Sequence, residues 1–294
     1  MQRVMERVRQ GPALERRVEQ QVWLDRVGDA VQRVFNANLR RLGPRERPVR
    51  DVLHGTWLGH PLHPVLTDVP VGAWTAALLL DAAGARRGAD VAVGAGIVGA
   101  AAAAPAGVAD WSYTRGGTRR LGVAHALLNT VALGLYSLSL VRRLQGRRGS
   151  GVAFSLAGYA VVLASAYLGG ELVYRLGTQV NRNAWTAGPG GFMPAVRESE
   201  LTEGRPVVAQ VNGVDVMLVR RGGRIYALEN TCAHQGGPLA EGTLEDGKVV
   251  CPWHGSTYRL EDGGVVHGPS PFDQPRYETR VVDGMVEVRE VPSA

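Results

Sequence analysis

Four long apolar runs lie between Val65 and Gly170 of this 294-residue sequence. Each run is 19 to 21 residues long, which is the length that an α-helix needs to cross the hydrocarbon core of a bilayer. The second and fourth runs contain no charged residue, whereas the helices of a soluble bundle normally carry a polar face. The sequence therefore predicts an all-α transmembrane four-helix bundle over 51–180, embedded in a lipid bilayer. The runs are Val65–Ala83, Val91–Ala109, Leu121–Val141 and Val152–Gly170.

Charge is divided unevenly along the chain. Residues 1–191 carry 23 Lys and Arg against 12 Asp and Glu, and residues 192–294 carry 10 against 15. The arginines cluster between apolar runs, which is typical of membrane flanks and not of a nucleic-acid surface, so we expect no nucleic-acid partner. The first twenty residues lack the apolar core of a signal peptide. The arginine distribution then predicts a multi-pass protein of the cell (plasma) membrane with both termini in the cytoplasm.

The segment 1–50 is basic, and apolar residues recur in it at helical spacing from Leu14 to Leu42. This pattern predicts an amphipathic helix over 13–42. Its basic face suits anionic lipid, and packing against the rest of the protein explains the pattern equally well.

The sequence changes character after a Gly/Pro linker over 181–194. Apolar-rich runs are joined there by pairs of turn-forming residues, which is a strong signal for β-hairpins. Residues 195–294 are therefore predicted to form a compact antiparallel all-β domain. The turn pairs are Asn212-Gly213, Gly222-Gly223 and Asp283-Gly284.

Two short motifs in this second half carry the metal-binding chemistry. The pattern is Cys232-x-His234, sixteen intervening residues, and Cys251-x-x-His254. Zinc fingers usually pair two cysteines on one turn and two histidines on another, whereas each loop here offers one of each. Such a set suits a two-iron cluster in which two thiolates hold one iron and two imidazoles hold the other. Structural zinc is the alternative.

Residues 195–294 resemble a Rieske [2Fe–2S] domain. The resemblance lies in "CAHQGGPL", "CPWHGSTY" and the proline-rich "GPSPFDQP". It implies that the two cysteines bind an iron that stays ferric, and that the two histidines bind the iron that changes valence. It also implies that Ser256 and Tyr258 donate hydrogen bonds to cluster sulfurs, which raises the reduction potential.

One departure from the family and two observations on the remaining histidines refine this expectation. Gly237 and Trp253 stand where respiratory Rieske proteins carry a second cysteine pair, so we expect no disulfide, an intermediate potential and a reducing compartment. His267 lies outside the ligand pattern, and we expect it on the surface or in a loop. No histidine follows it to help hold the mononuclear iron of an oxygenase, so a complete oxygenase is not expected.

The membrane half resembles the uncharacterised DUF2231 family in "GHPLHPVLTDVPVGAW", "HALLN" and "GGELVYRLG". Counting helix directions places nearly all the ionisable groups of the bundle at one membrane face, and we expect the β domain at that same face. These groups form a candidate redox or proton site. Its residues are His60, His63, Asp68, Asp110, His125, Asn129 and Glu171.

Several ligands suit this membrane site. A b-type haem between His60 or His63 and His125, a quinone and a non-haem metal are the candidates, and a plain anchor without a cofactor is the alternative. Proline follows both His60 and His63 and disfavours helical backbone at the residue before it. We therefore expect both histidines in an extended turn before the first membrane helix.

The first functional hypothesis is a membrane electron carrier that passes single electrons between the cluster and a haem, quinone or metal in the bundle. The second is an anchored Rieske ferredoxin that serves a separate oxygenase or reductase. The third is a redox sensor without turnover. An electron donor or acceptor protein, or a quinone, is the expected partner, and a homo-oligomer is left open.

Overall fold

The structure is a computed structural model that describes residues 13–292 and divides into two compact units. One unit contains the chain up to Glu46 together with Leu62–Thr178. The other contains Arg47–Pro61 together with the chain from Gln179 onward. The short segment Arg47–Pro61 thus packs with the β domain, although it precedes the bundle in the sequence. Positions 1–12 of the predicted basic segment lie outside the described residues.

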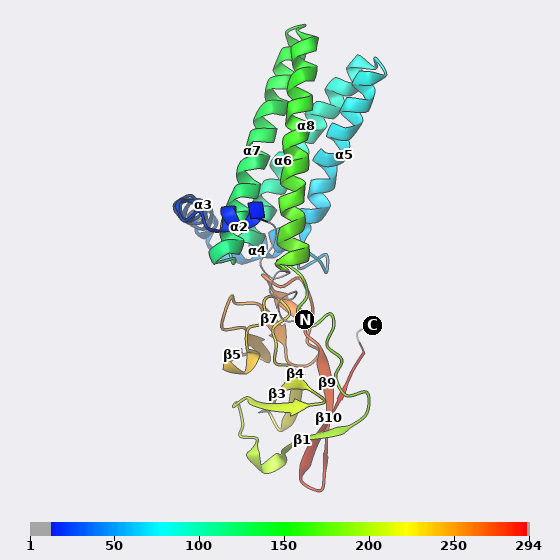
Figure 1. Ribbon diagram of the computed structural model, residues 1–294. Helices are drawn as coiled ribbons and strands as arrows, with labels where there is room; N and C mark the ends of the chain where they lie inside the picture. The colour runs from blue at the N-terminus through cyan, green and yellow to red at the C-terminus, as the bar shows by residue number, and fades with distance from the viewer. Residues whose placement is uncertain (1–12, 293–294) are drawn as a thin grey trace. The chain divides into compact units, whose positions relative to one another are not determined.

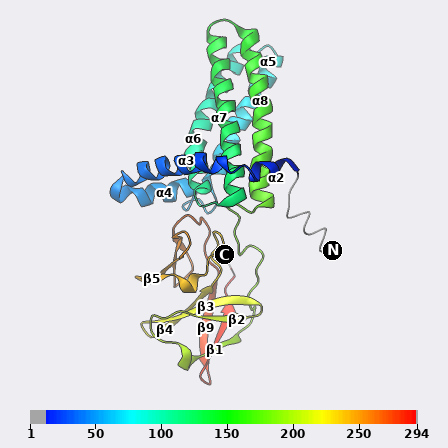
Figure 2. The same ribbon diagram turned by 60° about the vertical axis from the view of Figure 1, so that its left-hand side comes forward.

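Four long helices run side by side in the first unit, as Figures 1 and 2 show. All four are long and apolar enough to cross a membrane, which confirms the predicted bundle. Their outer surface keeps large apolar side chains exposed, such as Val98 at 70%, as expected where lipid replaces water. The helices are α5 Leu62–Ala82, α6 Arg86–Trp111, α7 Gly116–Leu144 and α8 Arg148–Gly170, and α8 continues into the π-helical turn η2 Glu171–Arg175.

The hairpins α5–α6 and α7–α8 share one packing arrangement. The residues that form it in the second hairpin follow those in the first by a constant number of positions. A Cβ added at Gly96 would lie 2.2 Å from the Trp74 ring, and one added at Gly158 would lie 2.9 Å from the Tyr136 ring. Each glycine thus lets its helix approach the aromatic ring of the preceding helix. The two rings then stack on each other, with centroids 4.0 Å apart and planes 3° apart. The hairpins therefore meet at the centre of the bundle through equivalent residues.

The N-terminal segment forms two helices, α2 Ala13–Glu19 and α3 Trp23–Arg40, which lie across one end of the bundle (Figures 1 and 2). The prediction of one continuous helix is wrong at residues 20–22. Arg120 of α7 donates to the Glu19 carbonyl at 2.8 Å and to the Asp25 carboxylate at 2.7 Å. This side chain takes the carbonyl at the end of α2 and so joins both helices to the bundle.

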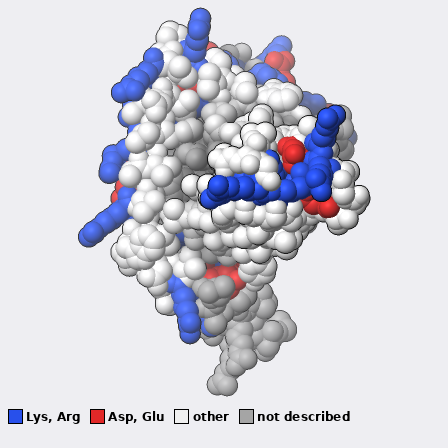
Figure 3. Space-filling view, turned by 90° about the horizontal axis from the view of Figure 1, so that it is seen from above, with Lys and Arg blue, Asp and Glu red and all other residues white. Residues whose placement is uncertain are grey.

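Both interpretations of the N-terminal segment have support from this packing. Leu24 and Leu39 are buried, whereas Trp23 and Val34 are 56% and 62% exposed. From above, blue Lys and Arg side chains stand out against a mostly white surface in Figure 3. One side of α3 therefore packs on the protein, and apolar and basic groups remain available to a lipid surface.

The second unit is an all-β domain of two antiparallel sheets. The larger sheet has the order β1-β10-β9-β4-β3-β2 and the smaller one β5-β6-β7-β8. The unit also contains α4, whose bounds are Glu46–His54. The strands are β1 Met193–Arg197, β2 Val207–Val211, β3 Val214–Arg221, β4 Arg224–Glu229, β5 Thr243–Glu245, β6 Lys248–Val250, β7 Thr257–Arg259, β8 Val265–His267, β9 Arg276–Val282 and β10 Met285–Glu290.

All three predicted hairpin turns are present. Both residues of each turn pair have positive φ, as in Asn212 at 52° and Gly213 at 79°, which matches the twist of antiparallel strands. The Gly/Pro segment before β1 packs on this domain. Asn183 donates to the Thr231 carbonyl at 2.9 Å, and the Arg182 amide donates to the Ala233 carbonyl at 3.0 Å.

Candidate functional site

The two ligand loops follow β4 and β6 and have the same backbone pattern. In each loop the amide of the glycine after the histidine donates to the carbonyl of the cysteine, from Gly236 to Cys232 at 2.8 Å and from Gly255 to Cys251 at 3.1 Å. Both glycines have φ near 80°, a conformation that L side chains rarely adopt. The matched turns direct one cysteine and one histidine from each loop toward a shared centre.

The four predicted ligands meet at that centre. The rings of His234 and His254 are 5.1 Å apart at their centroids and nearly perpendicular. The thiols of Cys232 and Cys251 interact with each other and are almost fully buried. Two sulfur and two imidazole donors thus face one small volume.

The electrostatics favour the metal-binding forms of Cys251 and His234, whereas the hydrogen bond to Cys251 and burial raise the pKa of Cys232 well above its usual value. The interaction with Cys232, together with the backbone amides of Trp253 and His254, outweighs burial and lowers the pKa of Cys251 to about 6. Burial, and then the neighbouring His254, lower the pKa of His234 to about 3. A thiolate and a neutral imidazole are the forms that ligate metals.

The arrangement fits a [2Fe–2S] cluster better than zinc. Within residues 13–292 no three His, Cys, Asp or Glu side chains are grouped so that they could hold one ion. A structural zinc ion needs four such ligands around itself. In a two-iron cluster each iron takes only two protein ligands and shares the sulfides. The donor set therefore supports the cluster that the sequence predicted.

A buried tyrosine reaches one of the ligand sulfurs. Tyr258 is fully buried in β7, and its hydroxyl lies 3.2 Å from the Cys232 sulfur. Burial raises the pKa of Tyr258 well above its usual value, so the hydroxyl keeps its proton and can donate it. The Ser256 hydroxyl accepts from the Ser270 amide at 3.0 Å. A hydrogen bond from Ser256 to a cluster sulfur stays a prediction.

We expect Tyr258→Phe to lower the reduction potential of the cluster by about 60–130 mV, because a hydrogen bond to a charged acceptor contributes roughly 1.5–3 kcal/mol and 59 mV corresponds to tenfold for one electron. The hydrogen bond that the variant lacks would stabilise the reduced cluster, which is the more negative form. Protein-film voltammetry on the full-length protein measures the shift. Tyr226→Phe, a tyrosine of β4 outside the ligand loops, serves as control. An unchanged potential in Tyr258→Phe would contradict the role of this hydroxyl.

Gly237 and Trp253, which stand where other Rieske proteins have a second cysteine pair, pack against each other. A Cβ added at Gly237 would lie 2.9 Å from the Cys251 sulfur and 3.0 Å from the Trp253 ring. Both cysteines of the chain are free. The indole thus occupies the space beside a residue that has no side chain.

Sequence reasoning missed a contribution from α4. Asp51 accepts from the His267 ring at 2.8 Å and from the Gly268 amide at 2.9 Å. His54 is 1% exposed, and a Cβ added at Gly268 would lie 3.3 Å from it. It also contributes to the lowered pKa of the ligand His234. The helix before the bundle thus packs on the third loop of the cluster site, and no local motif marks it for this role.

His267 differs from the expectation. It ends strand β8 and is partly buried by its bond to Asp51, so it is not a free surface or loop histidine. No sequence motif predicts the role of Gln274 either. Its side chain accepts from the Ala233 amide at 3.0 Å and donates to the Glu229 and Thr231 carbonyls at 2.7 Å, which fixes the first ligand loop.

The structure brings together three of the predicted membrane-site residues. The rings of His63 and His125 are 6.5 Å apart, and the Asn129 amide lies 3.0 Å from His125 Nε2. The expectation that His63 precedes the helix is wrong, because α5 begins at Leu62. The next residue, Pro64, falls in the first turn, where a missing amide proton breaks no helical bond.

Among the described residues none of the other predicted members completes a three-ligand metal site with that group. His60 belongs to the unit of the β domain. Asp68 is exposed on α5, and Asp110 is buried near the end of α6. Glu171 pairs with Arg175, which also binds Glu19 of α2 at 2.7 Å. Glu171 therefore has a packing partner that explains its position.

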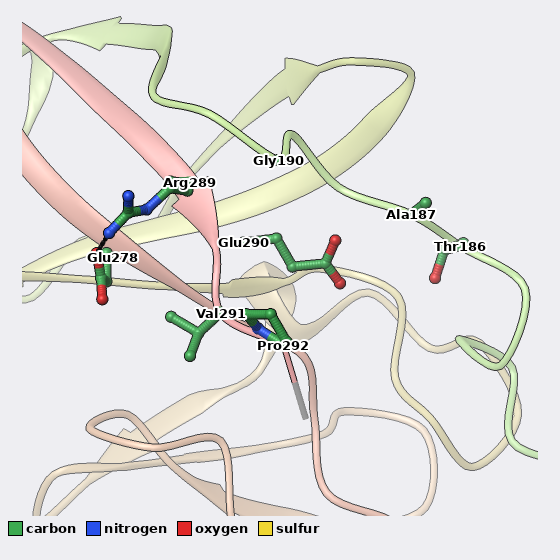
Figure 4. Close-up of a pocket in the computed structure, with 8 residues that line it drawn as sticks. All are labelled: Thr186, Ala187, Gly190, Glu278, Arg289, Glu290, Val291 and Pro292. Atoms are coloured by element: carbon green, nitrogen blue, oxygen red, sulfur yellow. Dashed lines mark hydrogen bonds and ion pairs between the residues drawn. The ribbon is translucent and has the colours of Figure 1, made fainter. Parts of the chain in front are cut away.

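A pocket of about 490 Å³ in the β domain is separate from the cluster ligands. Figure 4 shows Glu290 pointing into it and Arg289 turned toward Glu278. Its lining contains no cluster ligand and none of the predicted site residues. The lining residues are Thr186, Ala187, Gly190, Glu278, Arg289, Glu290, Val291 and Pro292.

Comparisons with known proteins agree with this geometry. Residues 191–278 match the Rieske [2Fe-2S] domain family, and residues 59–182 match DUF2231, a family of predicted membrane proteins. The anthranilate 1,2-dioxygenase ferredoxin subunit of Burkholderia cepacia is 33% identical over 89 residues, which cover 30% of this chain and 82% of that protein.

Two further relatives are larger than the matched region. The cytochrome b6-f complex iron-sulfur subunit of Chlorobaculum thiosulfatiphilum is 32% identical over 29% of this chain and 46% of that protein. Apoptosis-inducing factor 3 of Mus musculus is 29% identical over 31% of this chain, and the chain spans 15% of that protein. The chain belongs to the Rieske [2Fe–2S] family, with a region that matches the DUF2231 family of predicted membrane proteins before its Rieske domain.

Proposed function

We propose that this protein is a membrane-bound electron carrier that passes single electrons between its [2Fe–2S] cluster and a second redox site in the four-helix bundle. The pairing of His63 with His125 inside the bundle carries the proposal. Ionisable side chains within membrane spans are costly and usually serve a function. A bundle that served only as an anchor would not need two facing histidines.

The residues of the β domain would hold and tune the cluster. Cys232, His234, Cys251 and His254 are the proposed ligands, and the Tyr258 hydroxyl beside the Cys232 sulfur would stabilise the reduced form. When bound, a Rieske cluster accepts and releases one electron. Gln274 and Asp51 would keep the loops in place during this cycle.

A second function has support from one relative. The anthranilate 1,2-dioxygenase ferredoxin subunit is similar to this chain. By analogy, the alternative is a membrane-anchored ferredoxin that supplies electrons to a separate oxygenase or reductase. In that case the electron donor and acceptor would both be separate proteins, and the bundle would hold no redox group.

Counting electrons separates the two functions. The full-length protein in lipid nanodiscs is titrated anaerobically with a calibrated reductant while the Rieske signal is followed by electron paramagnetic resonance. The carrier is expected to take up one electron in the cluster and at least one more elsewhere. One additional electron indicates a metal centre, and two indicate a quinone. Uptake of a single electron per chain, all in the cluster, would overturn the carrier and leave the anchored ferredoxin.

The proposed location is the cell membrane, with the Rieske domain and the N-terminus in the cytoplasm. The arginine clusters beside the spans support this orientation under the positive-inside rule. Gly237 and Trp253 stand where respiratory Rieske proteins carry a second cysteine pair, which suits a reducing compartment.

A further inference from the structure

We propose that the second redox site is a haem iron bound between His63 and His125. This inference rests on the proposed electron carrier and names the cofactor of its membrane site. The two histidines occupy equivalent positions of the repeated hairpins, His63 as the second residue of α5 and His125 as the tenth residue of α7. The offset between them in the sequence is the same one that relates the stacked Trp74 and Tyr136.

Each histidine makes the same hydrogen bond to its own hairpin. His63 Nδ1 lies 3.0 Å from the Ala103 carbonyl of α6, and His125 Nδ1 lies 2.8 Å from the Ser165 carbonyl of α8. In both hairpins the carbonyl comes 40 residues after the histidine. The duplication has therefore kept the histidine and also the group that orients it.

These bonds fix which ring nitrogen carries the proton. A carbonyl oxygen can only accept, so Nδ1 donates in each ring and Nε2 keeps its lone pair. Metal-ligating histidines nearly always donate their other ring N–H to such a carbonyl or to a carboxylate. The Asn129 amide lies 3.0 Å from His125 Nε2, which agrees with a proton on Nδ1, and this amide would have to move aside for a metal. A neutral ring with its proton on Nδ1 can bind a metal through Nε2.

A glycine on the partner helix makes room for each ring. A Cβ added at Gly107 would lie 2.7 Å from His63 Cε1, and one added at Gly169 would lie 3.2 Å from His125 Cε1. These two glycines are again equivalent positions of the repeat. Close packing on the helix backbone restricts how far either ring can turn. The ligand positions are therefore held before any metal arrives.

The separation of the rings matches one bridging metal atom. The centroids are 6.5 Å apart and the planes are at 88°. Two metal–nitrogen bonds of about 2 Å, with the ring atoms behind them, place the centroids of axial imidazoles roughly 6 Å apart. A quinone hydrogen-bonded to both rings through opposite oxygens would need on the order of 10 Å.

The ligands of the metal other than the two histidines have to come from its cofactor. Among the described residues no third His, Cys, Asp or Glu completes a metal site with these two histidines. A bare ion with two protein ligands would be poorly held in a hydrocarbon environment. A porphyrin supplies four nitrogens and apolar edges, and leaves two axial positions for the imidazoles. Iron porphyrin thus satisfies both the spacing and the missing ligands.

His63 and His125 would hold the haem iron from both sides, so that it would transfer electrons and would not activate a substrate. One electron passing from the reduced cluster would oxidise the cluster and reduce the haem, with no bond formed or broken and no proton to move.

The test uses the full-length protein, expressed with iron and a haem precursor and purified in detergent. A pyridine haemochrome assay is expected to give one b-type haem per chain, and the ferric form is expected to show a six-coordinate low-spin resonance. His63→Ala and His125→Ala should each convert this resonance to high-spin. Added imidazole should restore the low-spin form in both variants, which a structural role of the histidines would not produce.

His60→Ala is the matched control, because it removes a histidine of the same sequence motif and should keep the low-spin form. A low-spin haem that survives both His63→Ala and His125→Ala would overturn the ligand assignment. The same holds if imidazole fails to restore it while the Rieske resonance is intact. Absence of haem with extra electrons in the redox titration would overturn the haem and keep the carrier. Absence of both would overturn the carrier as well.

Discussion

Replacing Cys251 with alanine is expected to remove the cluster and to destabilise the Rieske domain. Cys251 is buried, interacts with Cys232 and anchors the second ligand loop through its backbone bonds to Ser256 and Gly255. Free energy of metal binding is folding free energy when the ligands converge only in the folded state, so we expect a loss of about 5 kcal/mol or more. Iron content, the Rieske resonance and urea unfolding of the full-length protein measure the three effects.

His267→Gln is the matched control for this experiment. It replaces a histidine of the same domain that bonds to Asp51 and lies outside the ligand set. Its iron content and Rieske resonance should equal those of the wild type. If Cys251→Ala kept stoichiometric iron and the Rieske resonance, the ligand assignment would be wrong.

The β domain was predictable because its signals are local. Each ligand loop is a short continuous motif, and each hairpin turn is a residue pair such as Asn212-Gly213 whose positive φ demands those residue types. The four spans were predictable because helix length and lack of charge depend only on the sequence within each run.

Contacts between distant segments could not be predicted in the same way. Nothing within α4 indicates that Asp51 bonds to His267, since the two residues are 216 positions apart. The break between α2 and α3 depends likewise on Arg120, which is 101 positions from Glu19. Such pairs are set by how complete elements pack.

The internal duplication was visible in the sequence but requires comparison of the chain with itself. When the second hairpin is aligned on the first, His63 falls on His125, Gly96 on Gly158 and Gly107 on Gly169, all at one offset. Some of the matching residues make equivalent contacts in the two hairpins, whereas others, such as Gly72 and Gly134, have no close neighbour.

Arg143→Met is expected to destabilise the membrane bundle by about 1–3 kcal/mol, because it removes the fully buried partner of Asp81 and leaves that carboxylate with Arg148 alone. Arg143 follows Asp81 at the offset of the repeat, so these oppositely charged residues occupy equivalent positions of the two hairpins. The arginine side chain is fully buried, bonds to Asp81 and Asp90, and also contacts Ser139 at 3.0 Å. Thermal unfolding in detergent, followed by far-ultraviolet circular dichroism, measures the loss.

The position of Asp81 and Arg143 within the bundle explains why this pair should stabilise the protein more than a surface ion pair does. Along α5, His63, Trp74 and Asp81 recur after about three and then about two helical turns, and so share one helix face. Each faces its equivalent on α7, which makes Asp81 and Arg143 the polar end of the seam between the hairpins.

Arg142→Met, at the neighbouring position, should change stability by less than about 0.5 kcal/mol. The double variant Asp81→Asn with Arg143→Met should be more stable than Arg143→Met alone, because Arg148 then has only the Asp90 carboxylate to neutralise. If Arg143→Met matched Arg142→Met, the pair would contribute nothing to holding the hairpins together.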